Sequence, residues 1–592
     1  MLRYKITPID SHGHQFEVEI SIDAPSPQQQ LQLPAWLPGS YMIRDFAKHI
    51  SDLRAVSAAQ PQQQLPIQLI DKQTWQLETN GEAVRINYRV YAWDLSVRTA
   101  YLDQFWGFFN HSALCLAVTG KTDEPCQVDI VLPARLAHWK IATGMPRIAG
   151  DVWRAGSFSA PNYDALIDYP VLLGELTIAS FEVGEIPHHL VLVGKHYADM
   201  DRITADLAKI CEQQLTLFGE PAPFAEYWFL TMVLGKGFGG LEHRNSTALM
   251  CSRKDLATVK TTQVEADYRV FLSLCSHEYF HSWNVKSLKP KAFLPYQLQH
   301  EQYTEQLWFY EGMTSYFDDY VLHQAGLIDA QSYLQCVGEA IARVERGLGH
   351  QRQTVTESSF LAWTKFYQQN ENAPNAIVSY YAKGGLIGLC IDIMLRQSGA
   401  SSITLGDVMR QLWQAYGVTS IGTDDDTVIQ YFIDQQRDDI AAMLKRALYT
   451  TERLPLAELL ASVGVELQCV VPSDDNSYNG KPVKESLPVQ LGAKYKGSPL
   501  GLELTHVFLN EAAHEAGLAA GDRIIAIDYL AVQESNVKEV LGRFQPEQMT
   551  RIHAFRRDEL FSVDIRWHAP VASSRQLKIV DKTLAARWLR IT

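Results

Sequence analysis

Two histidines one helical turn apart are the first residues of this sequence whose types and spacing could carry out chemistry. His277 and His281 stand on either side of Glu278 in the run His-Glu-Tyr-Phe-His. Positions i and i+4 share one face of a helix, so both imidazoles could bind one metal ion. Zinc accepts imidazole nitrogen and lowers the pKa of a bound water, and Glu278 could take a proton from that water. The spacing predicts a zinc hydrolase with Glu278 as general base.

A catalytic zinc site needs a third protein ligand and one open position. Residues 307–314 (Leu-Trp-Phe-Tyr-Glu-Gly-Met-Thr) place a single carboxylate, Glu311, inside an apolar helical stretch. A buried carboxylate is costly unless it is paired or bound to a metal. We therefore expect Glu311 to be the third ligand. The alternatives are a buried ion pair or an exposed helix face for Glu311, and two helical histidines that bind no metal.

The motifs H-E-x-x-H and W-x-x-E-G together resemble those of the thermolysin-like gluzincins. The fuller string 277–286 (His-Glu-Tyr-Phe-His-Ser-Trp-Asn-Val-Lys) is similar to the glycyl aminopeptidase family, gluzincins that also carry a PDZ domain. Residues 37–41 (Leu-Pro-Gly-Ser-Tyr) resemble a motif of that family's N-terminal β domain. The resemblance spans nearly the whole chain. It implies one zinc ion, peptide substrates and a preference for small N-terminal residues, chiefly Gly and Ala.

An aminopeptidase must hold the cationic α-amine of its substrate near the metal, and a carboxylate does this best. The candidate is Glu242, which follows Gly239 and Gly240, where the backbone can approach a substrate strand closely. The segment looks like the G-x-M-E-N motif of the aminopeptidase N family, with Leu241 in place of Met and His243 in place of Asn. A plain turn is the alternative interpretation of these glycines.

Peptide hydrolysis also builds an oxyanion, which a phenol beside the metal could stabilise. Residues 381–384 (Tyr-Ala-Lys-Gly) are similar to the Y-x-K-G motif that supplies this tyrosine in relatives of aminopeptidase N. The motif register favours Tyr381, although the adjacent Tyr380 could be the donor, and a core tyrosine is the alternative. In the resulting hypothesis, Glu278 carries a proton from water to the leaving amine, and Glu242 fixes the substrate's register.

Two other functions fit parts of the same pattern. A zinc endopeptidase would need an unblocked cleft and no amine-binding role for Glu242. A PDZ-bearing binding or scaffold protein with a vestigial metal site belongs to a different class. Hydrolysis of a free aminoacyl substrate would separate the exopeptidase from both.

The elements that must position these residues indicate a multidomain α+β fold. Residues 1–175 alternate with period 2 between turns, which predicts an N-terminal antiparallel β domain. Residues 176–471 are expected to form a thermolysin-like α+β catalytic domain with a helical extension, and 472–592 a PDZ-like domain and tail. A polar loop is predicted at 370–375, short helices at 404–463 and a linker at 472–482. Long helices are expected over 203–218, 266–285, 332–348 and 378–397.

The PDZ-like prediction depends on Leu500-Gly501-Leu502 and on residues 512–527, and the β pattern ends near Arg566. Such domains add a peptide as an extra strand, and backbone N–H groups of the Leu-Gly-Leu loop can bind its C-terminal carboxylate. A peptide C-terminus or strand is therefore a possible partner. A purely structural module packed on the peptidase is the alternative.

Composition excludes few other classes. The chain has 592 residues, 46% hydrophobic, with a net charge of −14, which argues against nucleic acid as the main partner. No apolar run reaches about 18 residues, so we expect no membrane span, and the first residues do not read as a signal peptide. The eight cysteines are scattered without a C-x-x-C pair, which is typical of reduced thiols in a cytoplasmic protein.

Overall fold

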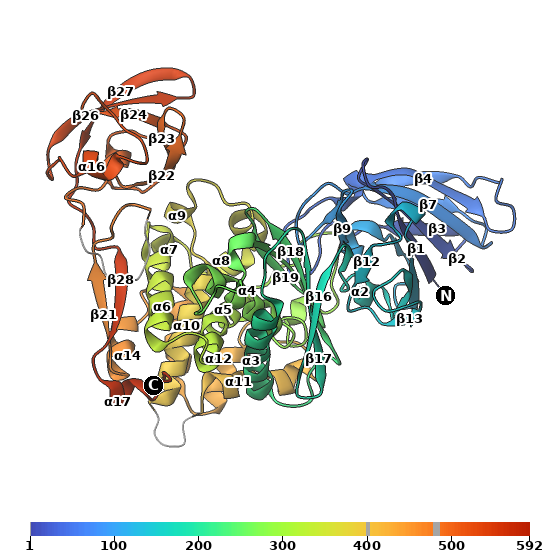
Figure 1. The fold of residues 1–592 in the computed structure, drawn as a ribbon. Helices are drawn as coiled ribbons and strands as arrows, with labels where there is room; N and C mark the ends of the chain where they lie inside the picture. Colours follow the sequence, from blue (N-terminus) through green and yellow to red (C-terminus); the bar gives the residue numbers. More distant parts are fainter. Residues whose placement is uncertain (1, 398–402, 477–485, 592) are drawn as a thin grey trace. The chain divides into compact units, whose positions relative to one another are not determined.

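The computed structural model of the chain describes residues 2–397, 403–476 and 486–591 (Figure 1). The chain divides into two compact units, each described by itself below. The first comprises Met1–Gln302 and Met409–Thr423, and the second Tyr303–Val408 and Asp424–Thr592. The linker predicted at 472–482 lies partly outside the described residues.

The first unit begins with three β-sheets. A seven-stranded sheet has the order β13-β14-β11-β1-β2-β7-β4, and two four-stranded sheets have the orders β10-β3-β6-β5 and β12-β15-β9-β8. Strand β2 illustrates why these segments form sheets with one buried face, because every second side chain from Phe16 to Ile22 is buried. All pairs are antiparallel except β1 with β11. These sheets confirm the predicted N-terminal β domain.

The strands of this region are β1 (Leu2–Asp10), β2 (Gln15–Ile22), β3 (Gln28–Gln32), β4 (Ile50–Ser57), β5 (Ile67–Asp71), β6 (Thr74–Glu78), β7 (Val84–Tyr91), β8 (Ala100–Leu102), β9 (Trp106–Phe109), β10 (Ala117–Val118), β11 (Cys126–Ile130), β12 (Lys140–Ala142), β13 (Arg147–Ala149), β14 (Gly156–Ala160) and β15 (Val171–Gly174), with short helices α1 (His111–Leu114) and α2 (Tyr163–Leu166).

A mixed five-stranded sheet follows in the same unit, with the order β16-β17-β18-β20-β19. Strands β17, β18 and β20 are parallel, and β19 forms an antiparallel edge. The elements are β16 (Thr177–Val183), β17 (Ile186–Val193), α3 (Met200–Phe218), β18 (Tyr227–Leu234), β19 (Phe238–Glu242), β20 (Ser246–Ser252) and α4 (Ala266–Phe280). Helix α4 was expected to continue to residue 285. It ends at Phe280, because Lys286 N–H donates to the His281 carbonyl at 3.0 Å and closes a turn.

Helices dominate the second unit. Its helices are α5 (Leu307–Gln324), α6 (Ala330–Glu345), α7 (Gly349–Arg352), α8 (Val355–Phe360), α9 (Ala373–Ala376), α10 (Tyr380–Arg396), α12 (Thr427–Asp434), α13 (Asp438–Tyr449) and α14 (Leu456–Ser462), and α11 (Leu405–Leu412) spans the division between the units. The loop predicted at 370–375 contains the start of α9, with proline near its first turn. Helix α6 ends at Glu345, three residues before its predicted end.

Helices α5 and α10 cross at glycines. A Cβ on Gly312 would lie 2.5 Å from the Cα of Gly384, and a Cβ on Gly384 would lie 2.4 Å from the Trp308 carbonyl oxygen. Such distances leave no room for any side chain, so the two backbones touch directly. The glycines of W-x-x-E-G and of Y-x-K-G therefore form one packing contact.

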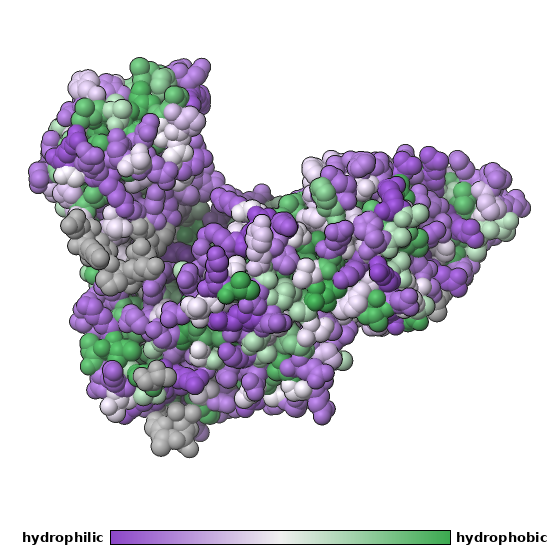
Figure 2. All heavy atoms as spheres, in the orientation of Figure 1, coloured by the Kyte–Doolittle hydropathy of each residue, from purple (hydrophilic) through white to green (hydrophobic). Residues whose placement is uncertain are grey.

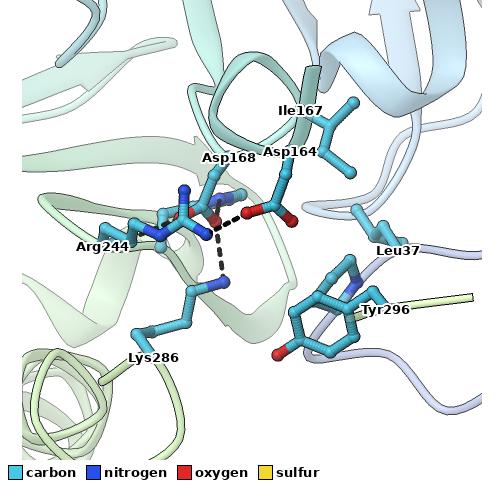
Figure 3. A pocket seen from close by; sticks show the side chains of 9 residues that line it. Leu37, Asp164, Ile167, Asp168, Arg244, Lys286 and Tyr296 are labelled. Carbon is cyan, nitrogen blue, oxygen red and sulfur yellow. Dashed lines mark hydrogen bonds and ion pairs between the residues drawn. The ribbon is translucent and has the colours of Figure 1, made fainter. Parts of the chain in front are cut away.

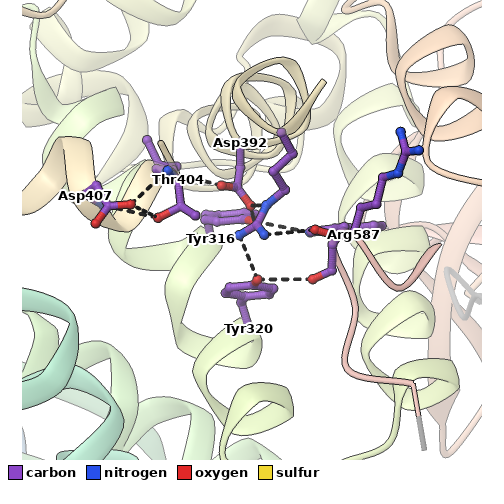
Figure 4. Close-up of polar contacts among 9 residues, drawn as sticks. Tyr316, Tyr320, Asp392, Thr404, Asp407 and Arg587 are labelled. Carbon is purple, nitrogen blue, oxygen red and sulfur yellow. Dashed lines mark hydrogen bonds and ion pairs between the residues drawn. The ribbon is translucent and has the colours of Figure 1, made fainter. Parts of the chain in front are cut away.

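A buried carboxylate on α10 ties this region together (Figure 4). Asp392 accepts hydrogen bonds from the Tyr316 hydroxyl at 2.7 Å, from Arg396 Nε at 2.8 Å and from Leu405 N–H at 2.9 Å. Arg396 also donates to the Arg587 carbonyl at 3.0 Å. The ion pair thereby joins α5, α10 and the C-terminal tail, and hydrogen bonds satisfy a charge that would be costly alone.

A small sheet of its own forms the C-terminal part of the second unit. Its path is β22-β23-β24-β26-β27, with β25 beside β24, around a separate apolar core. The chain then returns, and β28 pairs with β21, beyond the point near Arg566 where the β pattern was expected to end. The elements are β21 (Val465–Val470), β22 (Ala493–Ser498), β23 (Gly501–Val507), α15 (Ala512–Glu515), β24 (Arg523–Ile527), β25 (Leu530–Ala531), α16 (Val537–Leu541), β26 (Met549–Arg556), β27 (Glu559–Arg566), β28 (Ser574–Ile579) and α17 (Lys582–Ala585).

The surface is largely polar on the face shown in Figure 2, where hydrophobic residues are scattered among hydrophilic ones. Within the described ranges, no helix combines the length and the apolar character needed to span a membrane.

Candidate active site

The two histidines of the predicted metal site lie at the C-terminal end of α4. Their ring centroids are 4.7 Å apart, His281 is buried and His277 half-buried. Helix α3 fixes this end of α4, because Gln214 Nε2 donates to the carbonyl and the hydroxyl of Ser276, both at 2.9 Å. The helix therefore presents both imidazoles on one face from a rigid support.

The turn after α4 orients the second histidine. His281 Nδ1 lies 2.8 Å from the Asn284 carbonyl oxygen, which can only accept, so Nδ1 carries the proton and Nε2 is left with its lone pair. The same turn contains Val285 at φ +104°, a conformation that a β-branched residue rarely adopts. Val285 N–H donates to the Leu288 carbonyl at 2.7 Å and so helps to hold this strained residue in place. The imidazole is thus oriented by local backbone geometry.

A buried ion-pair cluster links this turn to the strand that carries Glu242 (Figure 3). Asp168 binds Lys286 Nζ at 2.7 Å, His243 Nδ1 at 3.1 Å and the backbone N–H of Arg244 at 3.1 Å. Burial alone would raise the pKa of Asp168, but the ammonium of Lys286 and the guanidinium of Arg244 outweigh it and lower that pKa. Asp168 therefore stays ionised and links the turn after α4 to the end of β19.

Sequence reasoning missed Asp168. It precedes His243 by 75 positions and belongs to the N-terminal region, where no motif marks it. The only local signal was Lys286, the last residue of the string 277–286. A lysine beside a buried turn implies a carboxylate partner, although it does not say which one.

Glu242 and Glu278 bring two carboxylates to one place. One ligand atom from each, together with one from His281, lie within 4.8 Å of one another. Glu242 is 4% exposed and Glu278 5%. Oε1 of Glu242 is buried without a hydrogen-bond partner among the residues that the structure describes. Two buried carboxylates this close favour a cation between them, either a metal ion or an ammonium group.

Glycines make room for both carboxylates. A Cβ on Gly240 would lie 1.9 Å from Glu278 Oε1, and a Cβ on Gly39 would lie 2.6 Å from each carboxylate oxygen of Glu242. Gly39 also has φ +91°, which favours glycine. Gly239 differs, because its nearest neighbour would be Arg98 Nη1 at 3.8 Å, an ordinary contact. Gly240 therefore gives space to the predicted general base, a role that the sequence pattern did not indicate.

The other two predicted site residues belong to the second unit. Glu311 lies on α5 and is 2% exposed, and Tyr381 is half-buried at the start of α10. Burial, and then the nearby carboxylate of Glu311, raise the pKa of Tyr381 well above its usual value. Tyr380 is fully buried. The crossing of α5 and α10 thus places Glu311 near Tyr381, and the role of Glu311 as third metal ligand stays a prediction.

The predicted peptide-binding loop of the C-terminal sheet forms a hairpin turn. Leu500 is exposed at the tip, and Gly501 pairs with Ser498 across it. Leu502 pairs with Gly497 on one side and with Ile524 on the other. No strand edge is therefore open at Leu502. Within the described part of this sheet, β22 pairs with β23 alone and is therefore the edge strand on the β23 side.

Comparison with known proteins identifies relatives of the chain. Residues 3–175 match the family model of the peptidase M61 N-terminal domain, and residues 270–387 match that of the M61 glycyl aminopeptidase. A search of curated proteins gives no significant match.

Solved structures are also similar. The crystal structure of an aminopeptidase N family protein from Idiomarina loihiensis is 57% identical, with a TM-score of 0.98 over 100% of both chains. An M1 zinc metallopeptidase from Deinococcus radiodurans is 12% identical, with a TM-score of 0.49 over 77% of this chain and 94% of its own. The family models and the 57% identical relative show that this chain belongs to the M61 glycyl aminopeptidase family, a family of peptidases.

Proposed function

We propose that this protein is a zinc-dependent aminopeptidase that hydrolyses the N-terminal peptide bond of peptides and favours small N-terminal residues such as Gly and Ala. Family membership supports the peptidase activity, and the family's name supports a small first residue. The position of the Glu242 carboxylate is the observation that supports the exopeptidase activity. This carboxylate lies at the edge strand beside Glu278 and His281, where the single positive charge of an α-ammonium group would offset one of two adjacent buried negative charges.

The residues that would hold the metal are His277, His281 and Glu311. Two imidazole nitrogens and one carboxylate are a donor set that suits catalytic zinc. The hydrogen bond from His281 to the Asn284 carbonyl supports this role, because metal-bound histidines usually donate their second ring N–H in this way. Burial of Glu311 on an apolar helix supports the third position. When bound, zinc would act as a Lewis acid and lower the pKa of a water molecule.

The remaining steps belong to the protein's own side chains. Glu278 accepts a proton from the attacking water and delivers it to the leaving amine. Tyr381 donates a hydrogen bond from its phenol O–H to the developing oxyanion, and its raised pKa keeps the phenol protonated at neutral pH. Its partial exposure favours Tyr381 over the fully buried Tyr380. Glu242 binds the N-terminal ammonium and sets which bond is cleaved.

A panel of aminoacyl-coumarin amides tests the proposal, with Gly, Ala, Leu and Arg each supplied as the free amine and as the N-acetyl derivative. We expect hydrolysis of the free Ala and Gly substrates, loss with 1,10-phenanthroline and recovery with added zinc. Glu242→Ala should lower kcat/KM about 10- to 100-fold at unchanged zinc content, since a hydrogen bond to a charged group contributes about 1.5–3 kcal/mol.

Each part of the proposal has an outcome that overturns it. Equal cleavage of acetylated and free substrates would indicate an endopeptidase. Activity that survives the chelator would refute the proposed dependence on zinc. A panel with no hydrolysis at any residue would leave a binding protein with a vestigial site.

We further propose the domain limits 1–175, 176–471 and 472–592, with a PDZ-like fold for the last, and a cytoplasmic location. The small sheet with its own core supports a separate C-terminal domain. None of the eight cysteines, all of which lie in the described ranges, forms a disulfide, which supports a reducing compartment.

A further inference from the structure

The segment that precedes the C-terminal sheet places a carboxylate on two consecutive backbone amides. Asp475 has a side chain that is only 1% exposed. Its oxygens accept hydrogen bonds from Leu491 N–H at 3.0 Å and from Gly492 N–H at 3.2 Å. Capture of a carboxylate by adjacent backbone N–H groups is how a peptide-binding loop recognises a chain end.

The next residue pairs with the open edge of β22. Asn476 Oδ1 accepts from Tyr495 N–H at 3.1 Å, and Asn476 Nδ2 donates to the Tyr495 carbonyl at 3.0 Å. These two bonds satisfy both backbone groups of one strand residue, as an added strand would. The side-chain amide of Asn476 therefore takes the position that a ligand backbone would use.

The preceding residue reaches the neighbouring helix. Asp474 forms an ion pair with Lys538 of α16 at 2.7 Å, and its other oxygen accepts from Asn476 N–H at 3.0 Å. Residues 474–476 are thus held by a loop, by a strand and by a helix of the C-terminal sheet. Three different contacts over three residues indicate a specific fit and not a chance crossing.

The amide loop is built to face a carboxylate. Gly492 has φ +76°, and a Cβ there would lie 2.4 Å from the Cβ of Glu511. Arg346, at the end of α6, forms a bidentate ion pair with Glu511, stacks over Phe508 at 3.5 Å and brings Nη2 to 3.9 Å from Asp475 Oδ1. The guanidinium partly offsets the charge of Asp475 in a buried place.

We propose that Leu491–Gly492 is a carboxylate-binding loop of the C-terminal domain, and that the protein's own Asp475 occupies it as an internal ligand. The site lies at the start of β22, not at Leu500–Leu502. An external peptide end has to displace a carboxylate tethered 16 and 17 residues away along the same chain, whose effective concentration is far above that of a free ligand. The domain is therefore closed to peptide ends and fastened to α6 through Arg346.

Hydrogen–deuterium exchange of the full chain, read on the peptide that covers residues 489–496, tests the proposal. Asp475→Ala should speed exchange of the Leu491 and Gly492 amides roughly tenfold or more, because both lose their acceptor. Sodium acetate should restore protection in this variant and have no effect on the wild type, and sodium chloride at the same ionic strength should restore nothing. Asp474→Ala is the matched control and should leave residues 491–492 protected.

Wild-type exchange at residues 491–492 in Asp475→Ala overturns the proposal, and so does a failure of acetate to restore protection. If this variant unfolds the whole domain, exchange will also rise in β24 and β26. Asp475→Asn then carries the test, since it keeps the shape of the side chain without the charge. Faster exchange confined to residues 491–495 supports the internal ligand, and unchanged exchange refutes it.

Discussion

Alanine at Gly240 should disable Glu278, the proposed general base, whereas alanine at the adjacent Gly239 should not. Both residues lie on edge strand β19, and both have been interpreted from sequence as places where a substrate approaches. The structure separates them, because only Gly240 faces Glu278. The pair offers one substitution at two neighbouring positions, which keeps the change in strand propensity the same.

The size of the effect follows from the distances. A Cβ at residue 240 would lie 1.9 Å from Glu278 Oε1, 2.4 Å from Cδ and 2.8 Å from Cγ. An ordinary contact is about 3.5 Å, so the carboxylate has to retreat by roughly 1.5 Å or adopt another rotamer. A misplacement of about 1 Å in a catalytic group can cost about 100-fold in rate. We therefore expect kcat to fall by about 100-fold.

The assay is hydrolysis of an alanyl reporter, with KM, zinc content and thermal unfolding measured on the same preparations. Gly240→Ala should lower kcat and leave zinc content within error of the wild type, since His277 and His281 are untouched. Gly239→Ala should stay within about twofold, because its Cβ meets only ordinary contacts. Wild-type kcat in Gly240→Ala, or an equal loss in both variants, would contradict the role assigned to Gly240.

Two further predictions concern buried charges in the first unit. Gly39→Ala should raise KM for substrates with a free N-terminus, because the new Cβ displaces Glu242. Gly120→Ala is the control: residue 120 has φ +82° and no atom within 4 Å of a Cβ placed there, so this variant carries the same backbone strain and should leave KM unchanged. Equal KM values in both variants would refute the contact between residue 39 and Glu242. Burial lowers the pKa of Lys289, which lies over the ring of Tyr296 at 5.0 Å, from 10.5 to about 7. The stability linked to Lys289 is therefore present above pH 10.5 and lost as pH falls to about 7, at about 1.4 kcal/mol per unit within that window. Urea unfolding should show Lys289→Met more stable than wild type at pH 7, with the difference smaller by about 2 kcal/mol at pH 9; a constant difference would refute it.

The placement of the candidate site residues was predictable wherever it depended on local spacing. The shared helix face of His277 and His281 could be predicted because an i, i+4 pair defines such a face without reference to the rest of the chain. The residue at which α4 ends could not, because the turn that stops it depends on Lys286, which is held by a carboxylate far away in the sequence. Glu278 was assigned correctly to the same helix, yet its need for Gly240 appears only when α4 packs on β19.

The two Leu-Gly pairs near the start of the C-terminal sheet also show that a local sequence pattern cannot reveal long-range pairing. The pair Leu-Gly occurs at Leu491–Gly492 and again at Leu500–Gly501, and the sequence alone favoured the second. Strand pairing distinguishes the two, because the second occurrence closes a hairpin in which Gly501 pairs with Ser498 and Leu502 with Gly497, and this difference supports the proposed loop at the first. A short motif identifies the type of backbone that it builds, and its neighbours in the sheet decide whether that backbone is open to a ligand.

The glycine crossing of α5 and α10 has a consequence for how this enzyme can change over time. Because the two backbones touch, the spacing between Glu311 and Tyr381 is set by main-chain atoms and not by the sizes of core side chains. Substitutions elsewhere in the helical core can accumulate without altering that spacing. A side chain at Gly312 or at Gly384 cannot be offset by shrinking a neighbour, since the atoms it would meet are backbone. Gly312 and Gly384 therefore constrain each other, and a tolerated substitution at either requires α5 and α10 to move apart.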